Sequence, residues 1–156
     1  MIVDTLTEFC DADSVAAAAS TALIGDVVDI SEVRDVGAGS QIYLVIQCTT
    51  SIITGGVAGT IKFQLASDAQ AAIAVDGSAT VHFDTGTFVT DGDDANALDA
   101  GAVIAKIQLP MESVNTYERF LGILCTIATT TVTAGAIDAF LTLDPSNIRQ
   151  YPDASN

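Results

Sequence analysis

His82 is the first residue to test for chemistry, because it is the single histidine and every Ser-His-Asp, Cys-His or histidine-metal site would need it. It lies in an alternating stretch in which Val81 and Phe83 point one way and His82 and Asp84 the other. The sequence has no G-x-S-x-G nucleophile elbow, and a cupin-type metal site needs several histidines. We therefore predict that the protein is not an enzyme and has no cofactor, and that His82 is exposed beside Asp84.

The acidic loop Asp91–Asp99 is a second candidate, because hard cations such as calcium take clustered carboxylates. The loop fails the EF-hand pattern, since its glycine is misplaced and Ala102 stands at the twelfth position, where a bidentate glutamate belongs. A solvated acidic turn without a metal is the favoured interpretation, and a looser cation site shared with another loop is the alternative. The glycines of Gly37–Gly39 precede a strand and lack the third glycine of a dinucleotide loop, so they predict a turn.

Cys10, Cys48 and Cys125 form no paired framework, and two of them fall inside strand patterns. A cysteine in such a position usually acts as a small hydrophobic residue. We expect three buried free thiols, which is consistent with assembly in a reducing compartment.

Glu118 and Arg119 are notable charges because they stand at the head of an otherwise apolar strand. They could form a cross-strand or surface ion pair of little energetic weight. Alternatively, the planar guanidinium of Arg119 could anchor a turn or a subunit contact. Tyr43 and Tyr117 fall within strand patterns, which leaves Tyr151 in the polar tail. Glu118, Arg119 and Tyr151 are our candidates for contacts with another subunit or a partner.

The composition limits the possible partners. The formal net charge is −15, from 5 Lys and Arg against 20 Asp and Glu, and such a surface repels phosphate, so we exclude nucleic acid. Hydrophobic residues make up 49% of the chain, yet its longest apolar run, Val15–Ala19, is far below the ~20 residues of a membrane helix. We therefore expect no membrane association. Acidic residues near the start, where a signal peptide would be basic, favour assembly in a cytoplasm.

Short strand patterns dominate the rest of the chain. Alternate residues form an apolar face over 41–49, 61–65, 81–85 and 103–109, and Ile52–Ile53 indicates a short edge followed by a turn. Frequent turn signals separate these runs, a density typical of an antiparallel β-sandwich or jelly roll. The length of 156 residues and the absence of linkers predict a single domain over 1–145. Residues 146–156 would form a loose polar tail.

The longest apolar stretches lie on either side of Thr129–Thr131, and they predict a β-hairpin. One face would carry alternate residues from both strands, and the other face would carry Phe120, Leu124 and Phe140. Both faces are apolar, so both should be covered by other parts of the chain. The first face comprises Leu121, Ile123, Cys125, Ile127, Ile137, Ala139, Leu141 and Leu143.

Two segments have helical character. Asp94–Ala100 could form one turn before Gly101. Val15–Leu23 is rich in alanine and could form a turn or two of helix after a cap at Asp13–Ser14, with Gly25 as its end.

Several blocks of the sequence resemble the capsid cement, or decoration, proteins of tailed bacteriophages of the podovirus type. The most specific are Tyr117–Gly122 and Thr133–Asp144. The weaker ones are Met1–Asp4, Arg34–Gln47, Phe63–Asp68 and Ile107–Met111. The resemblance implies a jelly-roll-like domain, with Val15–Leu23 extended, that binds as a homo-oligomer to the outside of an assembled capsid.

The function that follows from this resemblance is structural. The expected partners are the major capsid protein and further copies of the chain, as a dimer or trimer, on the outer surface of the virion. The alternative is a non-enzymatic ligand-binding module for carbohydrate or adhesion, which would need exposed aromatic side chains.

Overall fold

The structure, a computed structural model, describes residues 5–31, 41–91, 95–110, 115–146 and 148. Their regular elements are almost all strands, and the described residues contain no α-helix. In chain order the elements are the 3₁₀ helix η1 (Thr5–Thr7), β1 (Glu8–Ser14), β2 (Thr21–Asp29), β3 (Tyr43–Thr54), β4 (Thr60–Asp68), β5 (Thr80–Asp84), β6 (Phe88–Val89), the 3₁₀ helix η2 (Ala95–Leu98), β7 (Val103–Gln108), β8 (Phe120–Ala128) and β9 (Val132–Thr142).

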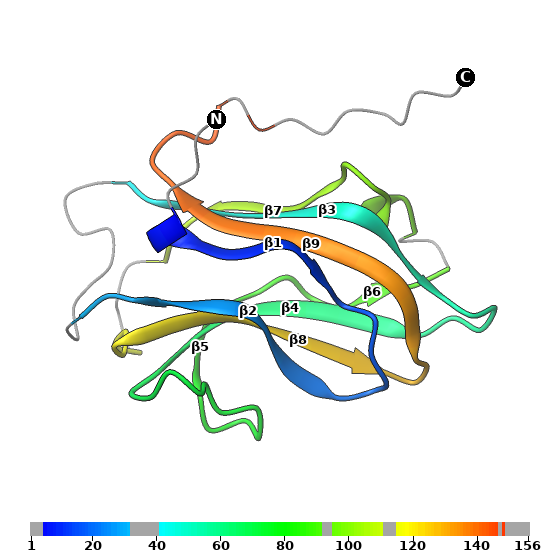
Figure 1. Cartoon of the computed structure of the whole chain (residues 1–156), viewed down its shortest axis with the longest axis horizontal. Helices are drawn as coiled ribbons and strands as arrows, with labels where there is room; N and C mark the ends of the chain where they lie inside the picture. Colours follow the sequence, from blue (N-terminus) through cyan, green and yellow to red (C-terminus); the bar gives the residue numbers. More distant parts are fainter. Residues whose placement is uncertain (1–4, 32–40, 92–94, 111–114, 147, 149–156) are drawn as a thin grey trace.

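The strands form two antiparallel sheets that pack face to face, as Figure 1 shows. The first sheet has the order β1-β9-β3-β7, and the second has the order β2-β8-β4-β5, with β6 also pairing with β4. The predicted β-sandwich is therefore confirmed. Within the described residues, no helix is long and apolar enough to cross a membrane.

The main core fills the space between the sheets, because each central strand turns alternate apolar residues inward. Leu44 and Ile46 of β3 and Phe63 and Leu65 of β4 are each 0% exposed and belong to one cluster. The inward and outward positions predicted for these two strands are confirmed. The second apolar run, Ile52–Ile53, is not a separate edge but the end of the long β3.

The predicted hairpin is wrong. β8 lies between β2 and β4 in the second sheet, and β9 lies between β1 and β3 in the first, so the short connection at Thr129–Thr131 crosses from one sheet to the other. The predicted inward residues, from Leu121 to Leu141, do line the common core. Those of β8 face those of β9 from the opposite sheet, so they are not neighbours within one sheet. Apolar alternation fixes which side of a strand is buried and leaves open which strand lies beside it. Leu143, assigned to the same face, is 70% exposed.

The expectation that both faces of these strands are covered is confirmed at two places. On the outside of the second sheet, Leu124 packs with Ile73 from the segment between β4 and β5. On the outside of the first sheet, Phe140 packs with Val45 and Ile148. Ile148 is only 8% exposed, so the tail predicted from residue 146 begins with a docked residue.

The two segments of helical character differ in outcome. Residues 95–98 form η2, as expected. Val15–Leu23 contains no helix. Its first residues run beside β9, where the Val15 amide donates to the Gly135 carbonyl at 3.0 Å. Its last residues belong to β2, which begins at Thr21. The extended alternative is therefore correct beside β9 and from Thr21 onward, with bends at 18–20 between these two parts.

Candidate functional site

The start of β8 is fixed to the end of β2 by a charged pair. Arg119 donates from Nε and Nη2 to the two carboxylate oxygens of Asp29, at 2.9 and 2.8 Å. The Ser31 amide donates to the same carboxylate at 2.7 Å. The hydrogen bonds from Arg119 and Ser31 lower the pKa of Asp29 from 3.8 to about 2. Asp29 thus pairs with Arg119 across the strands and also holds the turn at Ser31, a residue with a positive φ of 67°.

Beside this pair, Glu118 belongs to a hydrogen-bonded network that reaches into the sandwich. Its amide donates to Oγ of the fully buried Ser67 at 3.0 Å, and its carboxylate accepts from the Thr80 hydroxyl at 3.1 Å. Ser67 Oγ lies 2.7 Å from Nε2 of His82. The imidazole stacks on Tyr117, with ring centroids 3.8 Å apart. The network therefore joins β4, β5 and the residues leading into β8.

The prediction that His82 is exposed beside Asp84 is wrong. Leu65 pairs with Phe83 but Ala66 pairs with Val81, so His82 is the extra residue of a β-bulge. The bulge breaks the expected alternation, and it places His82 against Tyr117 and Ser67 while Asp84 stays on the outer face. As a result His82 is half-buried.

The Ser67–His82 contact has the spacing of a nucleophile and its base, but its surroundings are those of a structural hydrogen bond. Ser67 is 0% exposed, and its oxygen already accepts from the Glu118 amide. Tyr117, which is also 0% exposed, covers the imidazole and donates its hydroxyl to the Pro110 carbonyl at 2.6 Å. A substrate atom would have to displace this packing to reach the serine.

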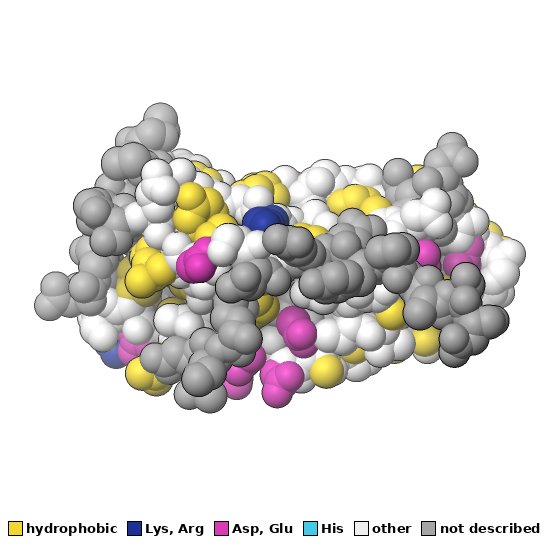
Figure 2. Space-filling model, turned by 90° about the horizontal axis from the view of Figure 1, so that it is seen from above, with side chains coloured by type: hydrophobic (Ala, Val, Ile, Leu, Met, Phe, Trp, Pro, Cys, Tyr) yellow, Lys and Arg dark blue, Asp and Glu magenta, His cyan; other side chains and the backbone are white. Residues whose placement is uncertain are grey.

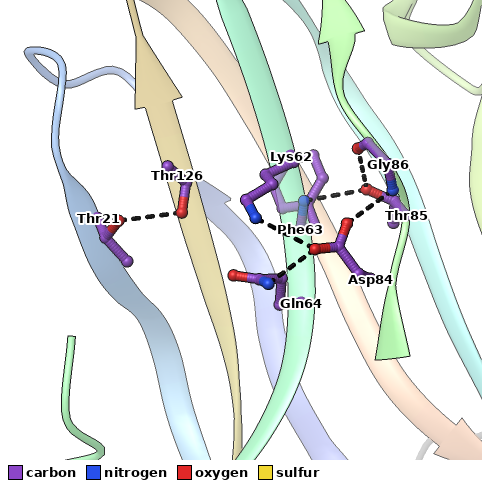
Figure 3. Close-up of polar contacts among 8 residues, drawn as sticks. All are labelled: Thr21, Lys62, Phe63, Gln64, Asp84, Thr85, Gly86 and Thr126. Atoms are coloured by element: carbon purple, nitrogen blue, oxygen red, sulfur yellow. Dashed lines mark hydrogen bonds and ion pairs between the residues drawn. The ribbon is translucent and has the colours of Figure 1, made fainter. Parts of the chain in front are cut away.

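The outer face of the second sheet carries a row of polar side chains across its strands (Figure 3). The Thr21 and Thr126 hydroxyls are 3.0 Å apart, and Lys62 and Gln64 donate to Asp84 at 3.1 and 2.7 Å. Burial tends to raise the pKa of Asp84, but the Gly86 amide, Lys62 and Gln64 together lower it. These side chains therefore satisfy one another across the sheet.

Each basic side chain in the described residues is engaged within the chain. Lys62 pairs with Asp84 and Arg119 with Asp29, while Lys106 donates to the Ile148 carbonyl at 3.1 Å. The acidic side chains are more numerous. Figure 2 looks down on the first sheet and shows acidic side chains scattered among hydrophobic and uncharged ones.

The acidic loop and the cysteines have structural roles where they are described. The Asp91 carboxylate accepts hydrogen bonds from the backbone amide and the hydroxyl of Thr54. Residues 92–94 of the loop lie outside the described residues. Within the described residues, no group of three or more side chains that could hold a metal ion occurs. The three cysteines are free and buried, as predicted. Burial raises the pKa of the Cys48 and Cys125 thiols to about 12 and that of Cys10 higher still, so all three are protonated at neutral pH.

The predicted contact residues are only partly brought together. Glu118 and Arg119 are neighbours that bind different strands, and Tyr151 lies outside the described residues, as does the turn at 37–39. Sequence reasoning missed Asp29 and Ser67, the partners of these two charges. Only the alternation of buried residues along β4, which turns Ser67 inward, could have indicated one of them.

The described residues thus define an all-β sandwich protein whose polar side chains largely hydrogen-bond to one another. Residues 9–141, nearly the whole sandwich, match the Bbp16 family, and the chain belongs to that family. The family has a bacteriophage-associated name. No curated protein matches the sequence.

Proposed function

We propose that this protein is a capsid cement, or decoration, protein that binds the outer surface of an assembled bacteriophage capsid and stabilises the contacts between capsomers. The observation that carries the proposal is membership of a phage-associated family over residues 9–141, the part of the chain that forms the sandwich. The partners are the major capsid protein and further copies of the chain. The protein acts without catalysis or a cofactor.

The charges support a position on the outside of the shell. The net charge is −15, and Lys62, Lys106 and Arg119 are all engaged within the chain. The cations of the described residues are thus already bonded within the chain, and the large negative net charge repels phosphate. These charges support a position on the outer surface, away from packaged nucleic acid.

The mechanism is thermodynamic. A protein that binds only the assembled lattice stabilises that lattice by about 2.7 kcal/mol per site when its concentration is 100 times the dissociation constant. If one oligomer contacts two capsomers, the second contact becomes intramolecular, and its effective concentration rises.

The alternative, a carbohydrate-binding or adhesion module, is less well supported by the described tyrosines. Tyr117 is fully buried under the network at the start of β8, and Tyr43 is half-buried with its hydroxyl bound to Gln41 at 3.0 Å. Tyr117 therefore presents no open ring for stacking on a sugar, and the Tyr43 side chain is only partly accessible.

The test uses particles assembled with and without the protein. Particles that lack it should assemble but break at lower temperature or milder osmotic shock, and adding the purified protein should restore their resistance. Co-sedimentation with particles, compared with free capsid subunits, shows whether it binds the lattice. Equal resistance of both kinds of particle would refute the proposal.

A further inference from the structure

The connection between β4 and β5, residues 69–79, lies on the outer side of the second sheet (Figure 1) and is described throughout. We call it the strap. Its backbone makes no hydrogen bond to the backbone of any other described residue. The carboxylate of Asp68, the last residue of β4, accepts from the amides of Gln70 and Ala74 at 3.1 and 3.0 Å. The other hydrogen bonds of the strap are internal.

One large side chain attaches the strap to the second sheet. Ile73 is 4% exposed and packs with Ala66 and Leu124, and Ala79 adds a small contact at the end of the strap. The residues at 69–72 and 75–78 are exposed. The attachment of the strap to the sheet therefore depends on Ile73.

The second sheet has a hollow where Ile73 is seated, because β8 has a glycine at this point. A Cβ atom on Gly122 would lie 2.6 Å from Cδ1 of Ile73 and 2.7 Å from Cδ1 of Leu23. The missing side chain thus makes room for the isoleucine. Val27 and Leu124 also border the hollow, so its walls are aliphatic. It lies on the same outer face as the polar row of Figure 3.

The strap and the sheet beneath it differ in how firmly they are held. Segments with few buried apolar contacts and few hydrogen-bonded amides open locally at a free energy well below that of global unfolding. The strap meets both conditions. The sheet does not, because β4 pairs with β8 without a register shift from Thr60 to Asp68, and β5 pairs with β4 from Thr80 onward. Both ends of the strap are thus fixed, and the part between them is free to move.

We infer that the strap lifts from the second sheet as a unit while the sandwich stays folded, and that it thereby withdraws Ile73 and uncovers the aliphatic hollow at Gly122. Asp68 is the hinge, because it belongs to β4 and binds amides of the strap. The closed strap covers an apolar patch on a face that is otherwise polar, and apolar patches of this kind are sites of association when they are exposed. This inference does not rest on the proposed function.

The first test places a reporter under the strap. Leu124→Cys puts a thiol at the border of the hollow, and the native Cys48 and Cys125, which are buried in the main core, report global unfolding in the same molecule. Labelling with a thiol reagent is followed at increasing urea concentration. We expect the introduced thiol to react with little dependence on urea and the native thiols to react only as the whole chain unfolds. Reaction of all the thiols over the same urea range would overturn the inference.

Three further substitutions in the Leu124→Cys background identify the anchor and the hinge. Ile73→Ala should speed labelling of the introduced thiol by about tenfold or more, because it removes the anchoring side chain. Asp68→Ala should act in the same direction by loosening the hinge. Val75→Ala is the matched control, because Val75 is on the same strap but 47% exposed, and it should change the rate by no more than about twofold. Equal rates for the isoleucine and valine variants would contradict the assignment of Ile73 as the anchor.

The second test uses the parent chain without substitution. The strap is rich in alanine, so a protease that cleaves after small aliphatic residues has sites within it. When opening is fast, cleavage follows the population of the open form. We expect cleavage within residues 69–76 in the absence of urea, with the two fragments remaining together as a folded sandwich by circular dichroism. Resistance of residues 69–76 until urea unfolds the whole chain would overturn the inference and leave the cement proposal standing.

Discussion

Arg119 and Asp29 are joined by two parallel hydrogen bonds, of 2.9 and 2.8 Å, that connect the start of β8 to the end of β2. The guanidinium carbon also lies 4.9 Å from the centroid of the Phe120 ring. A planar guanidinium group that donates from two nitrogens has a defined orientation, whereas a lysine ammonium making one contact does not. This pair therefore orients the chain where it enters β8.

The pair predicts a pH dependence of stability at acid pH. The pKa of Asp29 is about 2 in the folded chain against an ordinary 3.8, so its contribution is present above pH 3.8 and is lost as the pH falls toward 2. In urea denaturation, the difference between the parent and Asp29→Asn should therefore shrink over this range. The double variant Asp29→Asn/Arg119→Gln is the control. A difference that stayed constant down to pH 2 would contradict the prediction.

His82 should contribute to stability through its contacts with Tyr117 and Ser67. We expect His82→Ala to lower the free energy of unfolding by about 1–3 kcal/mol, because it removes an aromatic contact and leaves a buried hydroxyl with fewer partners. His82→Gln gives Ser67 a new hydrogen-bond partner but removes the stacking on Tyr117. It should therefore lower the free energy of unfolding by less than His82→Ala does. Thermal and urea unfolding measure both variants. Capsid binding by the folded His82→Ala variant should equal that of the parent, and its loss would indicate a direct role for the histidine.

Leu124 and Ile73 should behave as one packed unit on the outside of the second sheet. Leu124 is 4% exposed and Ile73 is also 4% exposed, so each change to alanine should cost about 2–5 kcal/mol. In a double-mutant cycle the effects should couple by about 0.5 kcal/mol or more, because both side chains belong to one packed cluster. Additive effects would show that the segment between β4 and β5 does not cover this face.

Gly25 should be intolerant of substitution. It has φ +66°, and a Cβ atom there would lie 2.0 Å from the Phe9 carbonyl oxygen. Gly86 is a matched control, because its φ is +76° but a Cβ atom would meet nothing within 4 Å. We expect Gly86→Ala to lose about 1–2 kcal/mol from backbone strain alone and Gly25→Ala to lose distinctly more. Equal melting temperatures for the two variants would exclude the steric effect.

Attachment to capsids should depend only weakly on salt. The sequence blocks that resemble cement proteins are mostly apolar, and apolar contacts are little affected by ionic strength, whereas contacts through the acidic loops would be screened. Rebinding of purified protein to depleted particles at low and high salt measures this. A hundredfold or greater loss of affinity at high salt would show that electrostatic contacts dominate.

The sequence predicted the side of each central strand that faces the core, because inward positions such as Leu44, Phe63 and Ile123 must be apolar whatever strands lie beside them. It did not predict the neighbours of β8 and β9, since pairing depends on contacts far apart in the chain. It also could not predict the position of His82. A bulge adds one residue on one strand only, and its effect is visible only in the register with the partner strand.

The positions of β8 and β9 have a consequence for synthesis of the protein. β9 separates β1 from β3, and β8 separates β2 from β4, so Glu8–Asp29 has no native strand to pair with until the ribosome has released the chain beyond Phe120. Neither sheet can be completed during most of translation. Completion of both sheets therefore waits for β8 and β9, and we expect it to take about milliseconds to seconds, the time typical of topologies dominated by distant pairings. Until then its unpaired apolar strands are open to aggregation.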